Sequence, residues 1–131
     1  MIPEIKIKEN LRVLLVEDNL LNQRLLNINL AKLNCIVTVA NNGLEGVESF
    51  KKQKFDVILM DLMMPVMDGY EATMLIRQLK TNRHTPLIAL TASIMPDEMQ
   101  KCLKVGFSDS ISKPIIRDNL YRILDKWLKI E

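Results

Sequence analysis

Five side chains able to bind a metal ion or a phosphoryl group stand at the ends of short apolar runs. Glu17 and Asp18 follow one run directly, Asp61 ends another, Thr91 ends a third and Lys113 follows the last. Each of them alone is more often a helix cap, a packed side chain or a solvated charge. The carboxyl ends of parallel strands meet at one edge of a sheet, where α/β folds bind their ligands. If the runs are strands of such a sheet, the five side chains share one site.

The residue types in this set favour metal-assisted phosphoryl transfer. Three converging carboxylates repel one another unless a cation lies among them, and oxygen ligands completed by water suit Mg²⁺, or Mn²⁺, better than zinc. The only histidine, His84, falls in a predicted loop outside the set. A hydroxyl and an ammonium near the same point would hold the outer oxygens of the transferred group. Asp61, at the centre, is the best nucleophile, because a carboxylate can form an aspartyl phosphate.

The elements that must position these residues follow from the alternation of apolar runs with helical periodicity. Runs that are apolar on both faces are typical of strands buried under helices in a parallel sheet. Five strand–helix units in series predict an α/β protein of the flavodoxin-like (βα)5 type. Its doubly wound, parallel five-stranded sheet has the expected strand order 2-1-3-4-5. The predicted strands are 13–16, 36–40, 57–60, 87–90 and, more weakly, 107–111.

Apolar spacing also predicts which helix faces turn toward the core. The third helix is expected to start at the turn formed by Asp68 and Gly69. The fourth opens with Pro96, which suits a first turn, and ends at Gly106, a favourable cap. In the first helix the predicted buried stripe consists of Leu21, Leu25, Ile28 and Leu33, widened by Leu26 and Leu30.

Length and composition indicate one globular domain. The chain has 131 residues, of which 48% are hydrophobic and 26% charged, and its net charge is +2. So small a charge gives no argument for direct binding to nucleic acid or to a membrane surface. No apolar run approaches the roughly 20 residues that span a bilayer. The two cysteines, Cys35 and Cys102, form no CxxC motif, which favours a reducing, cytoplasmic location. We expect a tail or linker at 1–10 and the domain at 11–131.

Four sequence segments resemble the receiver domains of two-component response regulators: LRVLLVEDN (11–19), DVILMDLMMPVMDG (56–69), ALTA (89–92) and SKP (112–114). They occur in the order and spacing of that family and cover the chain after residue 10. The segments 17–23 and 91–107 further resemble the receivers of hybrid sensor histidine kinases. The resemblance implies a phosphoacceptor that assists its own phosphorylation and dephosphorylation, rather than an enzyme in the usual sense. It implies a histidine kinase or a histidine phosphotransfer domain as the partner.

The resemblance implies a role for each residue of the metal site. Asp61 would be the phosphoacceptor and Asp18 a direct Mg²⁺ ligand, whereas Glu17 would act mostly through water. The backbone carbonyl of Met63 would be a further protein ligand. Asn22 also matches the hybrid-kinase pattern, although the polarity of an exposed helix explains it equally well.

The phosphoryl-binding part of the pattern is present, with one departure beside it. The resemblance implies that Thr91 bonds one phosphoryl oxygen and that Lys113 pairs with another, aimed by a cis peptide bond to Pro114. Receivers usually carry Tyr or Phe three residues before this lysine, where the chain has Ser110. Phe107 lies three residues earlier still, and simple strand alternation places its side chain on the opposite face of the sheet.

Three alternatives compete with a receiver. A flavodoxin-like nucleotide or FMN binder needs amides facing a phosphate after the first strand, but the sequence there is Glu-Asp-Asn, which repels an anion. A metal-dependent phosphatase usually carries a second acid two residues after its nucleophile, where this chain has Met63. A degenerate pseudo-receiver that acts only as an interaction module stays open, with Ser110 as its main support.

Overall fold

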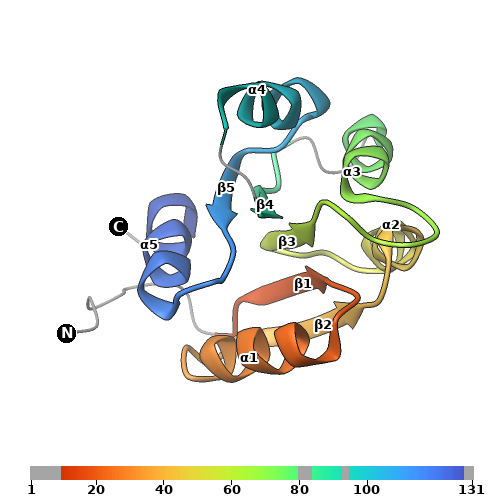
Figure 1. Ribbon diagram of the computed structural model, residues 1–131. Coiled ribbons are helices and arrows are strands. Elements are labelled where there is room, and N and C mark those ends of the chain that lie inside the picture. Colours follow the sequence, from red (N-terminus) through yellow and green to blue (C-terminus); the bar gives the residue numbers. More distant parts are fainter. Residues whose placement is uncertain (1–9, 80–83, 93–94, 129–131) are drawn as a thin grey trace.

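The computed structural model describes residues 10–79, 84–92 and 95–128, and these form a parallel five-stranded sheet between two helix layers (Figure 1). The strand order, β2-β1-β3-β4-β5, confirms the predicted flavodoxin-like topology. The expected tail lies almost wholly outside the described residues. The elements are β1 (Arg12–Val16), α1 (Leu20–Ala31), β2 (Ile36–Ala40), α2 (Gly43–Lys52), β3 (Val57–Asp61), α3 (Gly69–Gln78), β4 (Leu87–Thr91), α4 (Pro96–Val105), β5 (Asp109–Ser112) and α5 (Arg117–Leu128).

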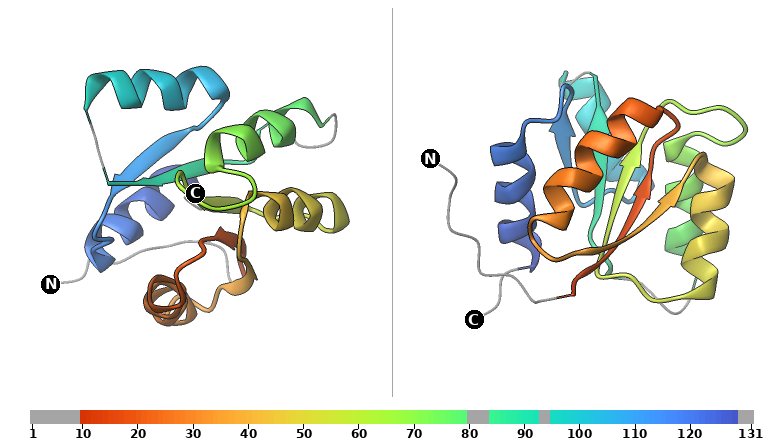
Figure 2. Two further views of the ribbon diagram at one scale, coloured as in Figure 1. Left: turned by 45° about the vertical axis from the view of Figure 1, so that its right-hand side comes forward. Right: turned by 90° about the horizontal axis from the view of Figure 1, so that it is seen from below.

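The helices bury opposite faces of the sheet (Figure 2). Helices α1 and α5 cover one face, and α2, α3 and α4 cover the other. Successive residues of a strand point to opposite faces, so Leu14 and Val16 of β1 pack toward α2, while Val13 and Leu15 pack toward α1. The central strands β3 and β4 are buried along their full length, which explains their unbroken apolar runs.

The two edge strands depart from the predicted pattern, because each has a neighbouring strand on one side only. Ile36 and Val39 of β2 are exposed, so this strand is not buried on both faces as its apolar sequence predicted.

Strand β5 begins at Asp109, whose carboxylate accepts hydrogen bonds from Lys126 Nζ at 2.9 Å and Trp127 Nε1 at 3.0 Å. Burial alone would raise the pKa of Asp109, but these hydrogen bonds outweigh it and hold the pKa below its ordinary value.

Helix α1 turns only part of the predicted stripe toward the sheet. Leu26 and Leu30 are buried, whereas Leu21, Leu25 and Ile28 are 64%, 53% and 55% exposed. With 3.6 residues per turn, these two sets lie on opposite sides of the helix. The prediction is thus confirmed for Leu26 and Leu30, and for Leu33, which packs against the same core, but it was wrong for the other three residues. Apolar side chains surround most of α1, so periodicity alone does not select the buried stripe. The helix therefore presents an apolar face to solvent.

Local capping fixes the loops at the carboxyl edge of the sheet. The side chain of Asn19 accepts a hydrogen bond from the backbone N–H of Asn22 at the start of α1, and Asp68 caps α3 in the same way. At the opposite edge, α4 ends at Val105 and is capped by Gly106, whose φ of 116° is a conformation that favours glycine. Within the described part of the chain, none of the helices has the length and apolar character needed to cross a bilayer.

Candidate functional site

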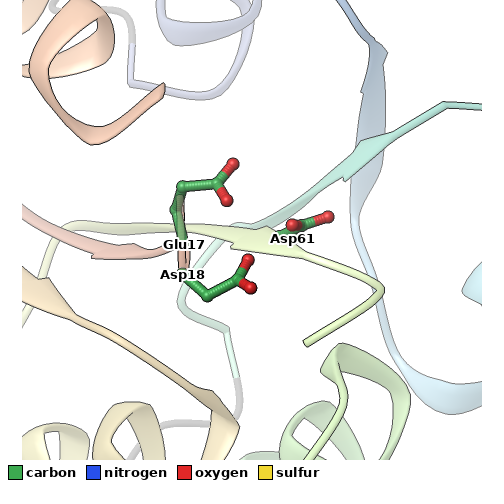
Figure 3. Close-up of side chains that lie close together, drawn as sticks. All are labelled: Glu17, Asp18 and Asp61. Atoms are coloured by element: carbon green, nitrogen blue, oxygen red, sulfur yellow. The ribbon is translucent and has the colours of Figure 1, made fainter. Parts of the chain in front are cut away.

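Three carboxylates gather where β1 and β3 end (Figure 3). Glu17, Asp18 and Asp61 each offer one oxygen, and these oxygens lie within 4.8 Å of one another. Glu17 and Asp61 are only 1% and 5% exposed, whereas Asp18 faces solvent. Buried carboxylates at such short range require a nearby positive charge. The cluster therefore has the oxygen donors and the electrostatic demand that suit a hard divalent cation.

Lys113 supplies one positive charge to this cluster. Its Nζ lies 3.0 Å from Asp61 Oδ1 and 3.5 Å from Glu17 Oε1. The Lys113–Pro114 peptide bond is cis, as the resemblance implied. Burial lowers the pKa of Lys113, but the hydrogen bond and charge of Asp61, with a smaller contribution from Glu17, outweigh it and raise the pKa above its ordinary value. The lysine is therefore a fixed cation beside Asp61.

The first turns of α1 hold Glu17 in place. Its carboxylate accepts hydrogen bonds from the backbone N–H of Asn19 at 3.1 Å and from Asn22 Nδ2 at 3.3 Å. The side-chain amide of Gln23 donates to the backbone carbonyl of Glu17 and to Asn41 Oδ1. Asn22 therefore contacts the site directly, and the polarity of an exposed helix does not account for it. The sequence did not indicate Gln23 as a site residue, because its two partners lie in different loops.

Burial raises the pKa of Glu17, and the negative charge of Asp61 raises it further. The hydrogen bond from Asn19 and the charge of Lys113 act in the opposite direction but do not cancel these effects. The ionised form of Glu17 is thus disfavoured by its surroundings. A bound divalent cation would favour that form.

Asp61 and Thr91 share a pocket of about 230 Å³. Thr91 is buried at the end of β4, and the backbone N–H of Met63 faces Asp61 Oδ1 at 3.4 Å. The pocket also contains Tyr70 and Glu98, which the sequence did not single out as site residues. The full lining consists of Asp61, Leu62, Met63, Tyr70, Leu90, Thr91, Ala92, Glu98 and Lys113.

Two glycines fix the loop between β3 and α3. The N–H of Gly69 donates to the carbonyl of Leu62 at 2.9 Å, and that of Gly43, at the start of α2, donates to the carbonyl of Met67 at 3.0 Å. A Cβ atom at Gly69 would lie 2.3 Å from the backbone oxygen of Asp61. Side chains are therefore excluded at this position, and the loop closes tightly behind Asp61. Within it, Val66 has a φ of 70°.

The position of Phe107 corrects one expectation. Phe107 and Ser110 line the same pocket of about 140 Å³ beneath α4, and Ser110 Oγ lies 3.1 Å from Met99 Sδ. The expectation that Phe107 faces the opposite side of the sheet was wrong because β5 begins only at Asp109, so strand alternation does not extend back to Phe107.

Comparisons with known proteins agree with the resemblance seen in the sequence. The family model described as response regulator receiver domain matches residues 13–125. Hybrid signal transduction histidine kinase G of Dictyostelium discoideum is 43% identical over 122 residues, which are 91% of this chain and 4% of that protein. Transcription factor SKN7 of Saccharomyces cerevisiae is 36% identical over 125 residues, 95% of this chain and 20% of that protein. The chain thus spans only a small part of these curated relatives.

Solved structures give the same result. The receiver domain of a sensor histidine kinase from Pseudomonas aeruginosa, with magnesium coordinated in its active-site cleft, is 40% identical with a TM-score of 0.85, covering 92% of this chain and 99% of that one. The receiver domain of Ssk1 from Saccharomyces cerevisiae, co-crystallised with the histidine phosphotransfer protein Ypd1, is 32% identical with a TM-score of 0.87, covering 94% and 92%. The topology, the acidic cluster at the switch point of the sheet and these matches show that the chain belongs to the response regulator receiver domains, the signal-receiving modules of two-component phosphorelays.

Proposed function

We propose that this receiver takes a phosphoryl group from a phosphohistidine on a partner protein onto Asp61, with Mg²⁺ or Mn²⁺ beside it. The observation that carries the proposal is the environment of Asp61, a buried carboxylate with Lys113 Nζ at 3.0 Å and two further acids at its side. An oxygen of Asp61 attacks phosphorus, the bond from phosphorus to the imidazole nitrogen breaks, and the nitrogen keeps the electron pair. The degenerate pseudo-receiver gains no support from the described residues.

The residues present fit the cation. Asp18 and Asp61 would hold it directly, Glu17 mostly through water, and the backbone carbonyl of Met63 would complete the protein ligands. The metal would shield the charge of Asp61 from the incoming anion. Lys113 holds one phosphoryl oxygen, and the hydroxyl of Thr91 donates to another. Support comes from the acidic cluster and from the magnesium-bound receiver of Pseudomonas aeruginosa.

The proposed partner is a histidine phosphotransfer domain that docks on α1. The outward face of this helix carries Leu21, Leu25 and Ile28, and a groove of about 100 Å³ runs from it to the Lys113 side of the site. An apolar helical surface docked there would place a phosphohistidine close to Asp61. The co-crystal of the Ssk1 receiver with Ypd1 supports this class of partner. The groove is lined by Glu17, Asn22, Leu25, Leu26, Asn29, Lys113, Pro114 and Ile115.

The phosphoacceptor is tested with Asp61→Asn and radiolabelled acetyl phosphate in Mg²⁺. Asn keeps the shape of the side chain and loses its nucleophilic charge, so labelling should vanish while circular dichroism shows an unchanged fold. Asp68→Asn is the matched control, because it removes an acid from the same loop and Asn caps a helix as well as Asp. Undiminished labelling of Asp61→Asn would place the phosphoryl group elsewhere.

The docking surface is tested with Leu25→Ser against Leu103→Ser, an exposed leucine on α4. Phosphotransfer to Leu25→Ser, from a phosphorylated histidine phosphotransfer protein that labels the wild type, should fall about tenfold. Labelling by acetyl phosphate should stay unchanged in both variants. Equal rates for the two leucine variants would mean that the donor docks on another face.

A further inference from the structure

The lining of the Asp61 pocket includes two residues from different helices. Tyr70 lies in the first turn of α3 and Glu98 in the first turn of α4, and both line the pocket that contains Asp61, Thr91 and Lys113. The hydroxyl of Tyr70 donates a hydrogen bond of 2.8 Å to Glu98 Oε2. A carboxylate is therefore held in the lining of the pocket into which a phosphoryl group on Asp61 would extend.

Tyr70 is itself fixed from two sides. Its ring meets Phe107 edge-on at a centroid distance of 6.4 Å, and Lys101 Nζ lies 4.1 Å from the ring centroid. Burial, together with the hydrogen bond to Glu98, raises the pKa of Tyr70, so its hydroxyl remains a donor at neutral pH. The rigid ring thus sets the position of the Glu98 carboxylate rather than following it.

We infer that Glu98, positioned by Tyr70, is a further residue of the phosphoacceptor pocket and that its charge opposes the gain of negative charge on Asp61. Lys113 lines the same pocket with the opposite sign and favours that gain. Like charges across a partly enclosed pocket interact more strongly than in water. Glu98 therefore lowers the equilibrium constant for phosphorylation of Asp61. Transfer of the phosphoryl group from Asp61 to another acceptor becomes more favourable by the same factor. This inference rests on the proposed function of Asp61.

The charge effect is measured with beryllofluoride, a phosphoryl mimic, in the presence of Mg²⁺. The apparent affinity of Glu98→Gln, followed by amide NMR titration, should be about fivefold tighter than that of the wild type at low ionic strength. Gln keeps an oxygen that accepts the Tyr70 hydrogen bond. Raising the salt to about 0.5 M should shrink the gain, because the Debye length falls from about 10 Å at 0.1 M to roughly 4 Å and the charges are screened more strongly. A structural role for Glu98 would not give this salt dependence.

Asp97→Asn is the matched control. Asp97 also lies in the first turn of α4, so Asp97→Asn changes the net charge and the interaction with the helix dipole as much as Glu98→Gln does. Asp97 lines a different pocket, however, together with Gln100 and Lys104. Its affinity for beryllofluoride should stay within about twofold of the wild type. Equal affinities of Glu98→Gln and Asp97→Asn, or a gain that salt does not reduce, would overturn the inference. Failure of the wild type to bind beryllofluoride would instead refute the proposed function.

Tyr70→Phe tests the positioning step. The variant keeps the ring against Phe107 and loses only the hydroxyl, so Glu98 is no longer held at the pocket. Its affinity for beryllofluoride should rise, but by less than that of Glu98→Gln. In the double variant, Tyr70→Phe should add nothing to Glu98→Gln, because the tyrosine acts through the carboxylate. Additive effects would show that Tyr70 does not act by positioning Glu98.

Discussion

Removing one carboxylate from the acidic cluster should stabilise the metal-free domain. Glu17, Asp18 and Asp61 offer oxygens within 4.8 Å of one another. Two unit charges at this separation repel by about 1 kcal/mol in water and about 3 kcal/mol at an effective dielectric constant near 20. The lower value applies, because Asp18 is exposed and Lys113 already contacts the other two acids. We expect Asp18→Asn to raise the free energy of unfolding by about 1 kcal/mol, or Tm by about 3–5 °C.

Addition of Mg²⁺ should reverse this order. Metal at about a hundredfold excess over its Kd stabilises the folded state by about 2.7 kcal/mol, and a variant without a direct ligand gains less. The measurement is thermal unfolding of both proteins by circular dichroism, with EDTA and with Mg²⁺. Glu71→Gln, which removes an exposed acid from α3 outside the cluster, should show the wild-type Mg²⁺ shift. Equal Mg²⁺-induced shifts in Asp18→Asn and wild type would refute the reasoning, since Asp18 would then not be a ligand.

Three further substitutions test the loop after β3 and the edge strand β5, each by urea unfolding. Gly69→Ala should destabilise the domain by about 2–3 kcal/mol, because its Cβ would lie 2.3 Å from the backbone oxygen of Asp61. An unchanged midpoint would contradict this. Val66→Asn should stabilise it by about 0.5–1 kcal/mol, since Val66 has a φ of 70°, is 77% exposed, and Asn tolerates positive φ far better. A lower urea midpoint for Val66→Asn would contradict backbone strain at Val66. Asp109→Asn should cost about 1 kcal/mol at neutral pH. Because the folded pKa of Asp109 lies below the ordinary 3.8, this stabilisation is present above the unfolded pKa and is lost as pH falls through the folded pKa. A difference that stays constant in acid would show that the charge is not its source.

The sheet and the carboxylate cluster could be predicted because both depend on short-range patterns. Strands β3 and β4 are buried on both faces, so their runs are apolar throughout, and the residues that follow such strands must meet at one edge. The sequence could not separate the buried from the exposed leucines of α1 in the same way. Its leucines surround the helix, and only the docking of the sheet selects Leu26 and Leu30.

Tyr70 and Glu98 could not be predicted as a pair because they are 28 residues apart on helices whose approach depends on packing. In the sequence, Glu98 had a sufficient explanation as an acid in the first turn of a helix. Ser110 stands where receivers usually carry an aromatic residue, and the sequence placed Phe107 on the opposite face of the sheet. Which face Phe107 occupies depends on the residue at which β5 begins. A two-residue shift in that boundary places Phe107 before the strand and beside Ser110, beneath α4.

The pairing of β1 with β3 has a consequence for the order of folding. Val16 lies beside Met60 in this pair, and the backbone N–H of Arg12 donates to the carboxylate of Asp56 across 44 positions. Contacts so distant in sequence form more slowly than those within a helix. Until β1 has paired with β3, Glu17 and Asp18 are not yet held beside Asp61. Metal binding during refolding would therefore report the pairing of β1 with β3, because Asp61 joins the other two carboxylates only when this pair has formed.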